Sequence, residues 1–218
     1  MSDSSFDFNL FIKESVDVLV NPKSYFSTMK TSGGMSEPLI KAVIYGAISG
    51  ALAFIWSLLR IGAMTGGWFG GTIGIMIFIW SIIGSIIGLF IGAVILLVIS
   101  SICKGNTDFE ANLRVTASVM AVWPIRSFFG FAGHFNVYLG VIIALIIGIY
   151  SLWLIYNGLV EALKSNPETS KIVCYVLIAI IVLFTLIGFG TARRAHQFMN
   201  EFNSRDMKEM MKDNPKNK

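Results

Sequence analysis

The sequence predicts an all-α protein, a polytopic membrane helix bundle of about five transmembrane helices with amphipathic helices at its N-terminus. Hydrophobic residues make up 55% of the 218 residues and charged residues only 14%, whereas soluble domains carry about 25% charged residues. No Asp, Glu, Lys, Arg or His occurs between Ile61 and Cys103. Apolar runs longer than about 18 residues are transmembrane candidates, and further runs of this kind follow after short polar connections.

Residues 1–37 are expected to form a cytosolic segment with short amphipathic helices. Apolar residues recur at helical spacing from Phe6 to Val20, with charged residues turned away from them. This stretch is too polar to span a membrane, so it predicts a helix that lies in the interface or docks on the bundle. Its charges also argue against a cleavable signal peptide. Asn21 and Pro22 begin a second short helix, which glycines 33 and 34 end.

Residues 38–192 are expected to form the transmembrane domain, and residues 193–218 a charged tail. The third span is the weakest because it contains Pro124 and Arg126, and proline kinks a helix. The second is longer than the roughly 20 residues that a span needs. A glycine-rich stretch, residues 62–71, predicts a loop or hairpin between the first two spans. The five predicted spans are Pro38–Leu59 (closed by Arg60), Thr72–Ile102, Ala111–Phe131, Val137–Leu163 and Ile172–Thr191.

The distribution of Lys and Arg favours a cytosolic N-terminus. With that orientation, inner segments before the tail hold eight of these residues and outer segments only two. Five crossings would nevertheless place the basic tail outside. Two alternatives remove the conflict: the third helix is re-entrant around Pro124, which leaves four crossings, or residues 61–103 make two short crossings, which gives six.

Small residues repeat on one face of three predicted helices. Glycines at four-residue spacing allow a partner helix backbone to approach closely, and such stripes drive helix association in lipid. They predict helix packing, either within the chain or with a protein partner or second copy in a homo-oligomer. The predicted packing residues are Gly46, Gly50, Gly84, Gly88, Gly92, Gly140 and Gly148.

No residue pattern points to catalysis, to a cofactor or to a metal. His134 and His196 have no second ligand at metal-binding spacing, and neither a nucleophile–base set nor a phosphate loop is found. Cys103 and Cys174 are expected to be small apolar residues. The net charge of +4 bears on orientation and on contact with the lipid bilayer, not on nucleic acid.

Charged residues near the predicted span ends are expected to be interface anchors, since long basic side chains snorkel toward water from such positions. Arg126 is the best exception, because it follows Pro124 in a kinked helix. Together with Asn157 it marks a possible polar pathway. The predicted anchors are Lys41, Arg60, Arg114 and Glu161.

Four segments in a fixed order resemble the Yip domain family of Ypt/Rab-interacting membrane proteins, in its bacterial branch. They are N-P-K-S-Y-F-S-T-M at 21–29, S-G-G-M-S-E-P-L-I-K-A at 32–42, A-V-W-P at 121–124 and Y-N-G-L-V-E-A-L at 156–163. The resemblance implies five membrane helices, a cytosolic N-terminus and residence in the bacterial cytoplasmic (inner) membrane. The D-L-Y-G-P motif of Golgi members is absent, so Rab binding is not implied. The family-motif residues are Pro22, Tyr25, Phe26, Pro38 and Pro124.

These features favour an integral membrane scaffold or adaptor without catalytic activity, in membrane organisation or a trafficking-like process. One alternative is a small transporter or channel with a water-accessible path around Pro124, Arg126 and Asn157. Another is a membrane-remodelling or lipid-sensing protein that acts through residues 6–20.

Overall fold

The structure is a computed structural model that describes residues 7–59 and 70–188. The chain forms two compact units, Met1–Ile178 and Ala179–Lys218, and the first of them contains the bundle. Four sequence predictions lie outside the described residues: the anchor Arg60, His196, the charged tail, and the glycine-rich connection as far as residue 69. The described residues are helices and short connections, which confirms the predicted all-α class.

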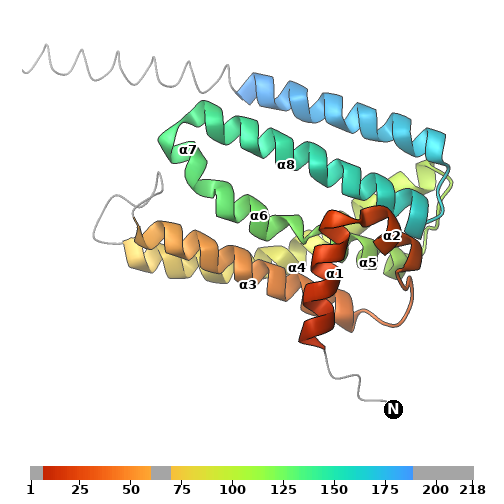
Figure 1. Ribbon diagram of the computed structural model, residues 1–218, viewed down its shortest axis with the longest axis horizontal. Coiled ribbons are helices and arrows are strands. Elements are labelled where there is room, and N and C mark those ends of the chain that lie inside the picture. The colour runs from red at the N-terminus through yellow and green to blue at the C-terminus, as the bar shows by residue number, and fades with distance from the viewer. Residues whose placement is uncertain (1–6, 60–69, 189–218) are drawn as a thin grey trace, which may run out of the picture. The chain divides into compact units, whose positions relative to one another are not determined.

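Two short helices begin the fold. Helix α1 spans Phe8–Val20, and the carboxylate of Asp7 caps it by accepting hydrogen bonds from the first free backbone N–H groups. Helix α2 spans Pro22–Thr28, with the proline in its first turn as expected. It ends earlier than predicted, and the glycines at 33 and 34 lie in the following connection with positive φ angles of 136° and 98°. In Figure 1, α1 crosses the long helices instead of running along them.

Helices α3 (Ser36–Leu58) and α4 (Gly70–Ile102) form an antiparallel pair. A Cβ at Gly46 would collide with the side chain of Ser85, and one at Gly50 would come 3.0 Å from Ser81 Cβ. The two backbones therefore approach closely where glycine faces serine. Because α4 is one continuous helix, the alternative of two short crossings is wrong.

The third predicted span is broken into pieces: α5 (Phe109–Val119), α6 (Val122–Phe128), η1 (Phe129–Phe131) and α7 (Ala132–Phe135). Pro124 explains the break, because proline has no N–H for the carbonyl four residues earlier and its ring clashes with it. That carbonyl, of Met120, instead accepts from Trp123 N at 2.9 Å. Four described helices are long and apolar enough to cross a membrane, and this passage is not one of them.

The broken passage still runs beside α3 from one end to the other. Near the start of α3, Glu37 pairs with Arg114 of α5 at 2.8 Å. Near its end, Trp56 Nε1 donates to the carbonyl of Ser127 in α6 at 3.1 Å. The chain therefore does not turn back at Pro124, and a re-entrant third helix is wrong. Four unbroken helices plus this passage make up the predicted five.

Helix α8 (Val137–Asn157) returns along the bundle and ends in a π-helical turn, Gly158–Ala162. Together they match the predicted fourth span, Val137–Leu163, to within one residue. The last described helix, Pro167–Gly188, begins five residues earlier than predicted. Asn166 is the reason, because its side-chain oxygen accepts from the backbone N–H groups of Glu168 and Thr169, as an N-cap does. Residues from 179 onward belong to the second unit.

Two connecting loops are joined to each other by reciprocal backbone hydrogen bonds. Asn106 N donates to Leu163 O at 2.7 Å, and Asn166 N donates to Cys103 O at 2.9 Å. Each loop has a Lys-x-Asn sequence whose lysine, 104 or 164, adopts a positive φ of 57° or 53°. We call this pair of loops the loop clasp. It fixes the α4–α5 connection and the connection after α8 at the same end of the bundle.

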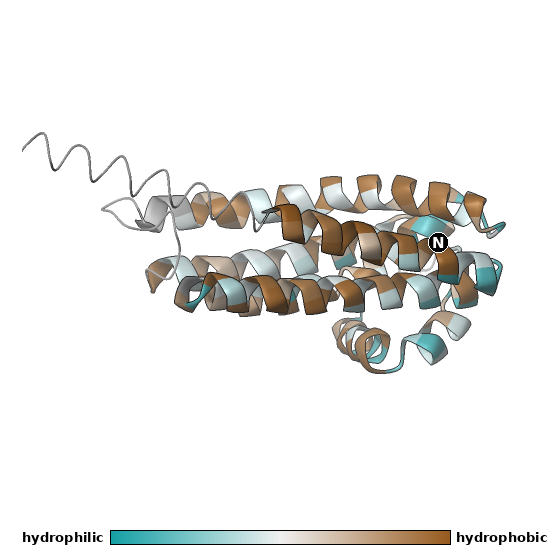
Figure 2. Ribbon diagram, turned by 90° about the horizontal axis from the view of Figure 1, so that it is seen from above, coloured by the Kyte–Doolittle hydropathy of each residue, from teal (hydrophilic) through white to brown (hydrophobic). Residues whose placement is uncertain are grey.

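The predicted packing glycines mostly meet their own chain. A Cβ at Gly88 would come 2.9 Å from Trp123, one at Gly92 would come 2.8 Å from Thr116, and one at Gly140 would come 2.5 Å from Gly133 Cα. Gly84 has open space around it and Gly148 is half-buried in α8. Intrachain packing therefore accounts for most of the stripe. Figure 2 shows hydrophilic residues gathered at the end of the first unit that carries α2 and the loop clasp.

Candidate functional site at the N-terminal cleft

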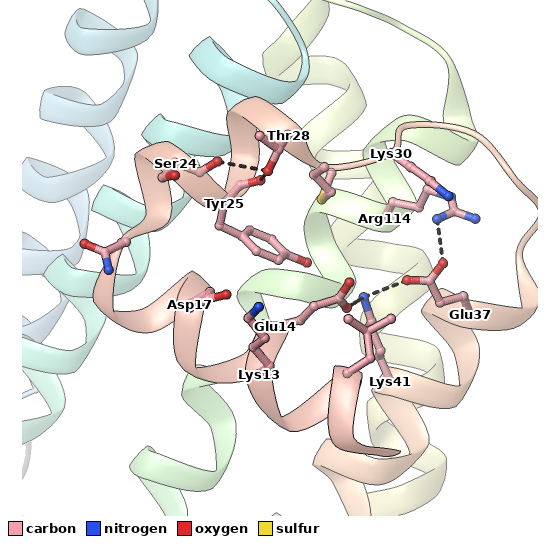
Figure 3. Close-up of a pocket in the computed structure, with 13 residues that line it drawn as sticks. Lys13, Glu14, Asp17, Ser24, Tyr25, Thr28, Lys30, Glu37, Lys41 and Arg114 are labelled. Atoms are coloured by element: carbon pink, nitrogen blue, oxygen red, sulfur yellow. Dashed lines mark hydrogen bonds and ion pairs between the residues drawn. The ribbon is translucent and has the colours of Figure 1, made fainter. Parts of the chain in front are cut away.

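Helices α1, α2, α3 and α5 enclose a cleft of about 640 Å³, which we call the N-terminal cleft. Figure 3 shows side chains from all four helices directed at this space. The α1 side carries Lys13, Glu14 and Asp17, and the α2 side carries hydroxyls. The full lining is Leu10, Lys13, Glu14, Asp17, Asn21, Ser24, Tyr25, Thr28, Met29, Lys30, Glu37, Lys41 and Arg114.

A chain of ion pairs joins the helices around the cleft. Lys41 Nζ lies 2.7 Å from a carboxylate oxygen of Glu14 and 2.7 Å from one of Glu37. Glu37 in turn pairs with Arg114, whose Nε lies 3.1 Å from Glu110. The α1 helix is thereby attached to α3, and α3 to α5, through alternating charges (Figure 3).

The loop before α3 closes this network. Arg114 Nη2 donates to the carbonyl of Gly34 at 2.9 Å, and the N–H of Gly34 donates to Glu110 at 2.6 Å. A Cβ at Gly33 would come 2.9 Å from the guanidinium, and its φ of 136° already favours glycine. The two adjacent glycines of the second motif segment therefore allow the backbone to approach the Arg114 guanidinium closely.

The prediction that Lys41 and Arg114 snorkel toward water is wrong. Lys41 is 6% exposed and Arg114 is 5% exposed. Carboxylates from other helices stand over both groups, and a buried charge without such partners would be strongly unfavourable. A sequence signal was present: Glu37–Lys41 and Glu110–Arg114 are both Glu-then-cation pairs at four-residue spacing, each at the start of a helix.

Two titratable groups outside the membrane spans are shifted by these surroundings. Burial raises the pKa of Tyr25, so its phenol stays protonated and shares a 2.9 Å hydrogen bond with Ser118 Oγ. The N–H of Gly34, followed by Arg114, lowers the pKa of Glu110. Glu110 therefore remains ionised to a lower pH than a free carboxyl.

The family-motif residues of the N-terminal segment hold α2 in place. Pro22 and Pro38 are buried, and Phe26 is fully buried. Phe26 packs where Gly158 leaves room, since a Cβ there would meet Val115 at 2.5 Å and the Phe26 ring at 3.5 Å. Residues from the first and fourth motif segments thus meet, whereas Pro124 breaks the helix elsewhere on the bundle.

Three charged groups that line the cleft have no ion pair among the described residues: Lys13, Asp17 and Lys30. Both lysines are exposed, and Asp17 is half-buried. By contrast, the predicted anchor Glu161 has only a surface partner, Lys23, at 3.9 Å. The cleft therefore has a neutralised floor and three charges free for a ligand.

The predicted polar pathway is not assembled around one cavity. Arg126 is exposed and lines a separate pocket of about 310 Å³ with the first half of α8, as far as Ile147. Asn157 is buried at the other end of α8, and its amide donates to the carbonyl of Trp153 at 2.8 Å. Residues 7–59 and 70–188 also contain no group of three or more possible metal ligands.

Three of the motif segments meet at one end of the helix bundle. In a comparison against known families, the Yip1 domain matches residues 16–189. The chain belongs to the Yip1 domain family. This confirms the resemblance seen in the four motif segments. No curated protein and no solved structure matches the chain. The Yip1 match runs from the middle of α1 to the end of the last described helix. It includes the loop clasp and most of the N-terminal cleft, whose lining residues Leu10, Lys13 and Glu14 precede it.

Proposed function

We propose that this Yip1 domain protein is a membrane scaffold or adaptor without catalytic activity, which presents α1 and α2 as a fixed platform at the membrane surface. The observation that carries the proposal is the ion-pair chain from Glu14 through Lys41 and Glu37 to Arg114. It pairs the charges of the cleft floor with one another and holds α1 against the bundle, while the buried Pro22 and Phe26 hold α2 there. A platform of this kind suits docking better than acid–base chemistry.

The partner would meet the outer face of α2 and not the glycine stripes, because most of those glycines already contact their own chain. Ser27 is exposed on α2 and does not line the cleft. We further propose that the platform faces the cytosol and that the protein resides in the bacterial inner membrane. The Lys and Arg distribution supports this orientation.

A photo-reactive amino acid at Ser27 in the full-length protein tests the proposal in intact membranes. We expect one discrete protein adduct of defined mass, from a partner or from a second copy. The matched control is the same probe at Ile91, an exposed apolar residue within the α4 span, where no discrete protein adduct should form. Absence of an adduct at Ser27, together with a monomeric mass by light scattering, would contradict the proposal.

A further inference from the structure

The contacts of α1 with α3 show which edge of α1 points toward the middle of the membrane. Glu14 meets Lys41, near the start of the α3 span. Ser15 Oγ lies 2.8 Å from the hydroxyl of Tyr45, one turn further along α3, and the rings of Phe11 and Tyr45 are 5.2 Å apart. The Glu14 edge of α1 therefore faces the membrane boundary, and the Phe11 edge lies deeper.

Beyond that deeper edge, α1 carries an exposed apolar stripe at four-residue spacing. It consists of Phe8, Ile12, Val16 and Val20, all of them exposed. At about 100° per residue the stripe continues around the helix from Phe11 and Ser15, whereas Asp17 lies on the opposite side with Glu14. The hydroxyl of Tyr150, within the α8 span, also bonds to the carbonyl of Leu19. The stripe thus lies at the depth of acyl chains, and the N-terminal cleft on the other side lies at the depth of lipid headgroups.

The free charges of the cleft specify the headgroup. Lys13 and Lys30 supply two unpaired cations, whereas Asp17 supplies an unpaired carboxylate. Glu14 and Glu37 also line the cleft but are paired with Lys41 and Arg114, so the carboxylate of Asp17 is the like charge that a purely anionic group would meet. A ligand with both a phosphate and a primary ammonium satisfies all three free groups.

The geometry points to the N-terminal cleft as a binding site for an aminophospholipid headgroup, whose phosphodiester meets Lys13 and Lys30 and whose ammonium meets Asp17. The exposed hydroxyls of Ser24 and Thr28 supply further hydrogen bonds on the α2 side. A cleft of about 640 Å³ is within the usual range of roughly 300–1,000 Å³ for small-ligand sites. The acyl chains would continue along the apolar stripe of α1.

Native mass spectrometry of the full-length protein, with defined lipids added to the detergent, tests the inference. We expect phosphatidylethanolamine to be retained about tenfold better than phosphatidylcholine, whose trimethylated nitrogen donates no hydrogen bond. Lys13→Gln with Lys30→Gln should lower that retention about tenfold. Lys23→Gln is the matched control, because this exposed lysine lies outside the cleft lining, and it should leave retention unchanged.

Asp17→Asn gives the sharper result, since it should remove the preference for phosphatidylethanolamine and raise the retention of phosphatidylglycerol. Competition with soluble glycerophosphoethanolamine and with inorganic phosphate separates a lipid site from a site for free phosphate. Strong competition by phosphate alone would overturn the lipid assignment, and so would equal retention of the three lipids or an Asp17→Asn variant that keeps the wild-type preference. These substitutions leave Ser27 intact, so the photo-adduct there tests the scaffold role independently.

Discussion

Replacing Lys41 by methionine should loosen α1 without unfolding the bundle. The substitution keeps an unbranched side chain of similar length but removes the ammonium that two carboxylates share at 2.7 Å each. Hydrogen bonds to charged groups contribute about 1.5–3 kcal/mol each. Both partners are partly solvated, with side chains 29% and 44% exposed for Glu14 and Glu37, and Glu37 keeps Arg114. We therefore expect a loss of about 2 kcal/mol, well below the simple sum of two such bonds.

A loss of about 2 kcal/mol shifts the docking equilibrium of α1 about 30-fold. Hydrogen exchange of the Phe8–Val20 amides in detergent or nanodiscs measures that equilibrium directly, and exchange there should accelerate about 30-fold while α4 is unchanged. Glu14→Gln in the Lys41→Met background should restore part of the protection, because Glu14 is the carboxylate left without a cation.

The matched control is Lys23→Met, which removes a side chain that is 80% exposed and 3.9 Å from its partner. It should change exchange little, as surface pairs contribute about 0–1 kcal/mol. If Lys41→Met exchanges like Lys23→Met, the ion pairs do not hold α1, and the argument for a fixed platform fails.

Three further predictions concern packing, pH and the loops. Gly46→Ala should cost about 1–2 kcal/mol in thermal unfolding, because its Cβ meets Ser85, whereas Gly84→Ala has open space and should be neutral or stabilising by up to about 1 kcal/mol. The pKa of Glu110 is lowered in the folded protein, so the ionised carboxylate stabilises the fold fully above the ordinary carboxyl pKa. This stabilisation should be lost as pH falls through the lower folded pKa. Glu110→Gln should therefore flatten the acid side of a plot of melting temperature against pH. Asn166→Ala should cost about 1 kcal/mol by removing a cap, whereas Lys104→Gly should gain about 1 kcal/mol by relieving a positive φ, both measured by thermal unfolding.

The long apolar helices could be predicted from the sequence, because hydrophobic length is sufficient to identify them. The ends of α3, α4 and α8 fall within two residues of the predicted ends wherever both are described, once the π-helical turn after α8 is included. A kink at Pro124 is predictable from the sequence, but the extent of the break is not. Whether a proline bends a helix or divides it depends on what the freed carbonyl finds, and here Trp123 N satisfies it within a tight turn.

The buried ion pairs of the N-terminal cleft could not be predicted from the sequence for a related reason. A lysine or arginine near a span end has two outcomes with the same local sequence: it reaches out to water, or it is covered and paired. Hydropathy cannot separate them. A glutamate four residues earlier gives each cation one partner, but the carboxylates that cover Lys41 and Arg114 come from other helices and lie far away in the chain. Glu14 is 27 residues from Lys41, and Glu37 is 77 residues from Arg114.

Position along a span therefore predicts depth but not solvation. Solvation is decided here by α1, which crosses the bundle and covers the first turns of α3. To do so, this short helix needs one polar edge and two apolar edges. The sequence between Phe8 and Val20 contains both apolar edges but cannot distinguish them. The structure shows that one edge packs on Tyr45 and that the other remains exposed. A helix that appeared merely amphipathic thus has one face for the protein, one for lipid and one for the cleft. The pairing of Glu14 with Lys41 follows from that arrangement, because an apolar α1 would leave the buried Lys41 with Glu37 alone, a carboxylate that Arg114 also shares.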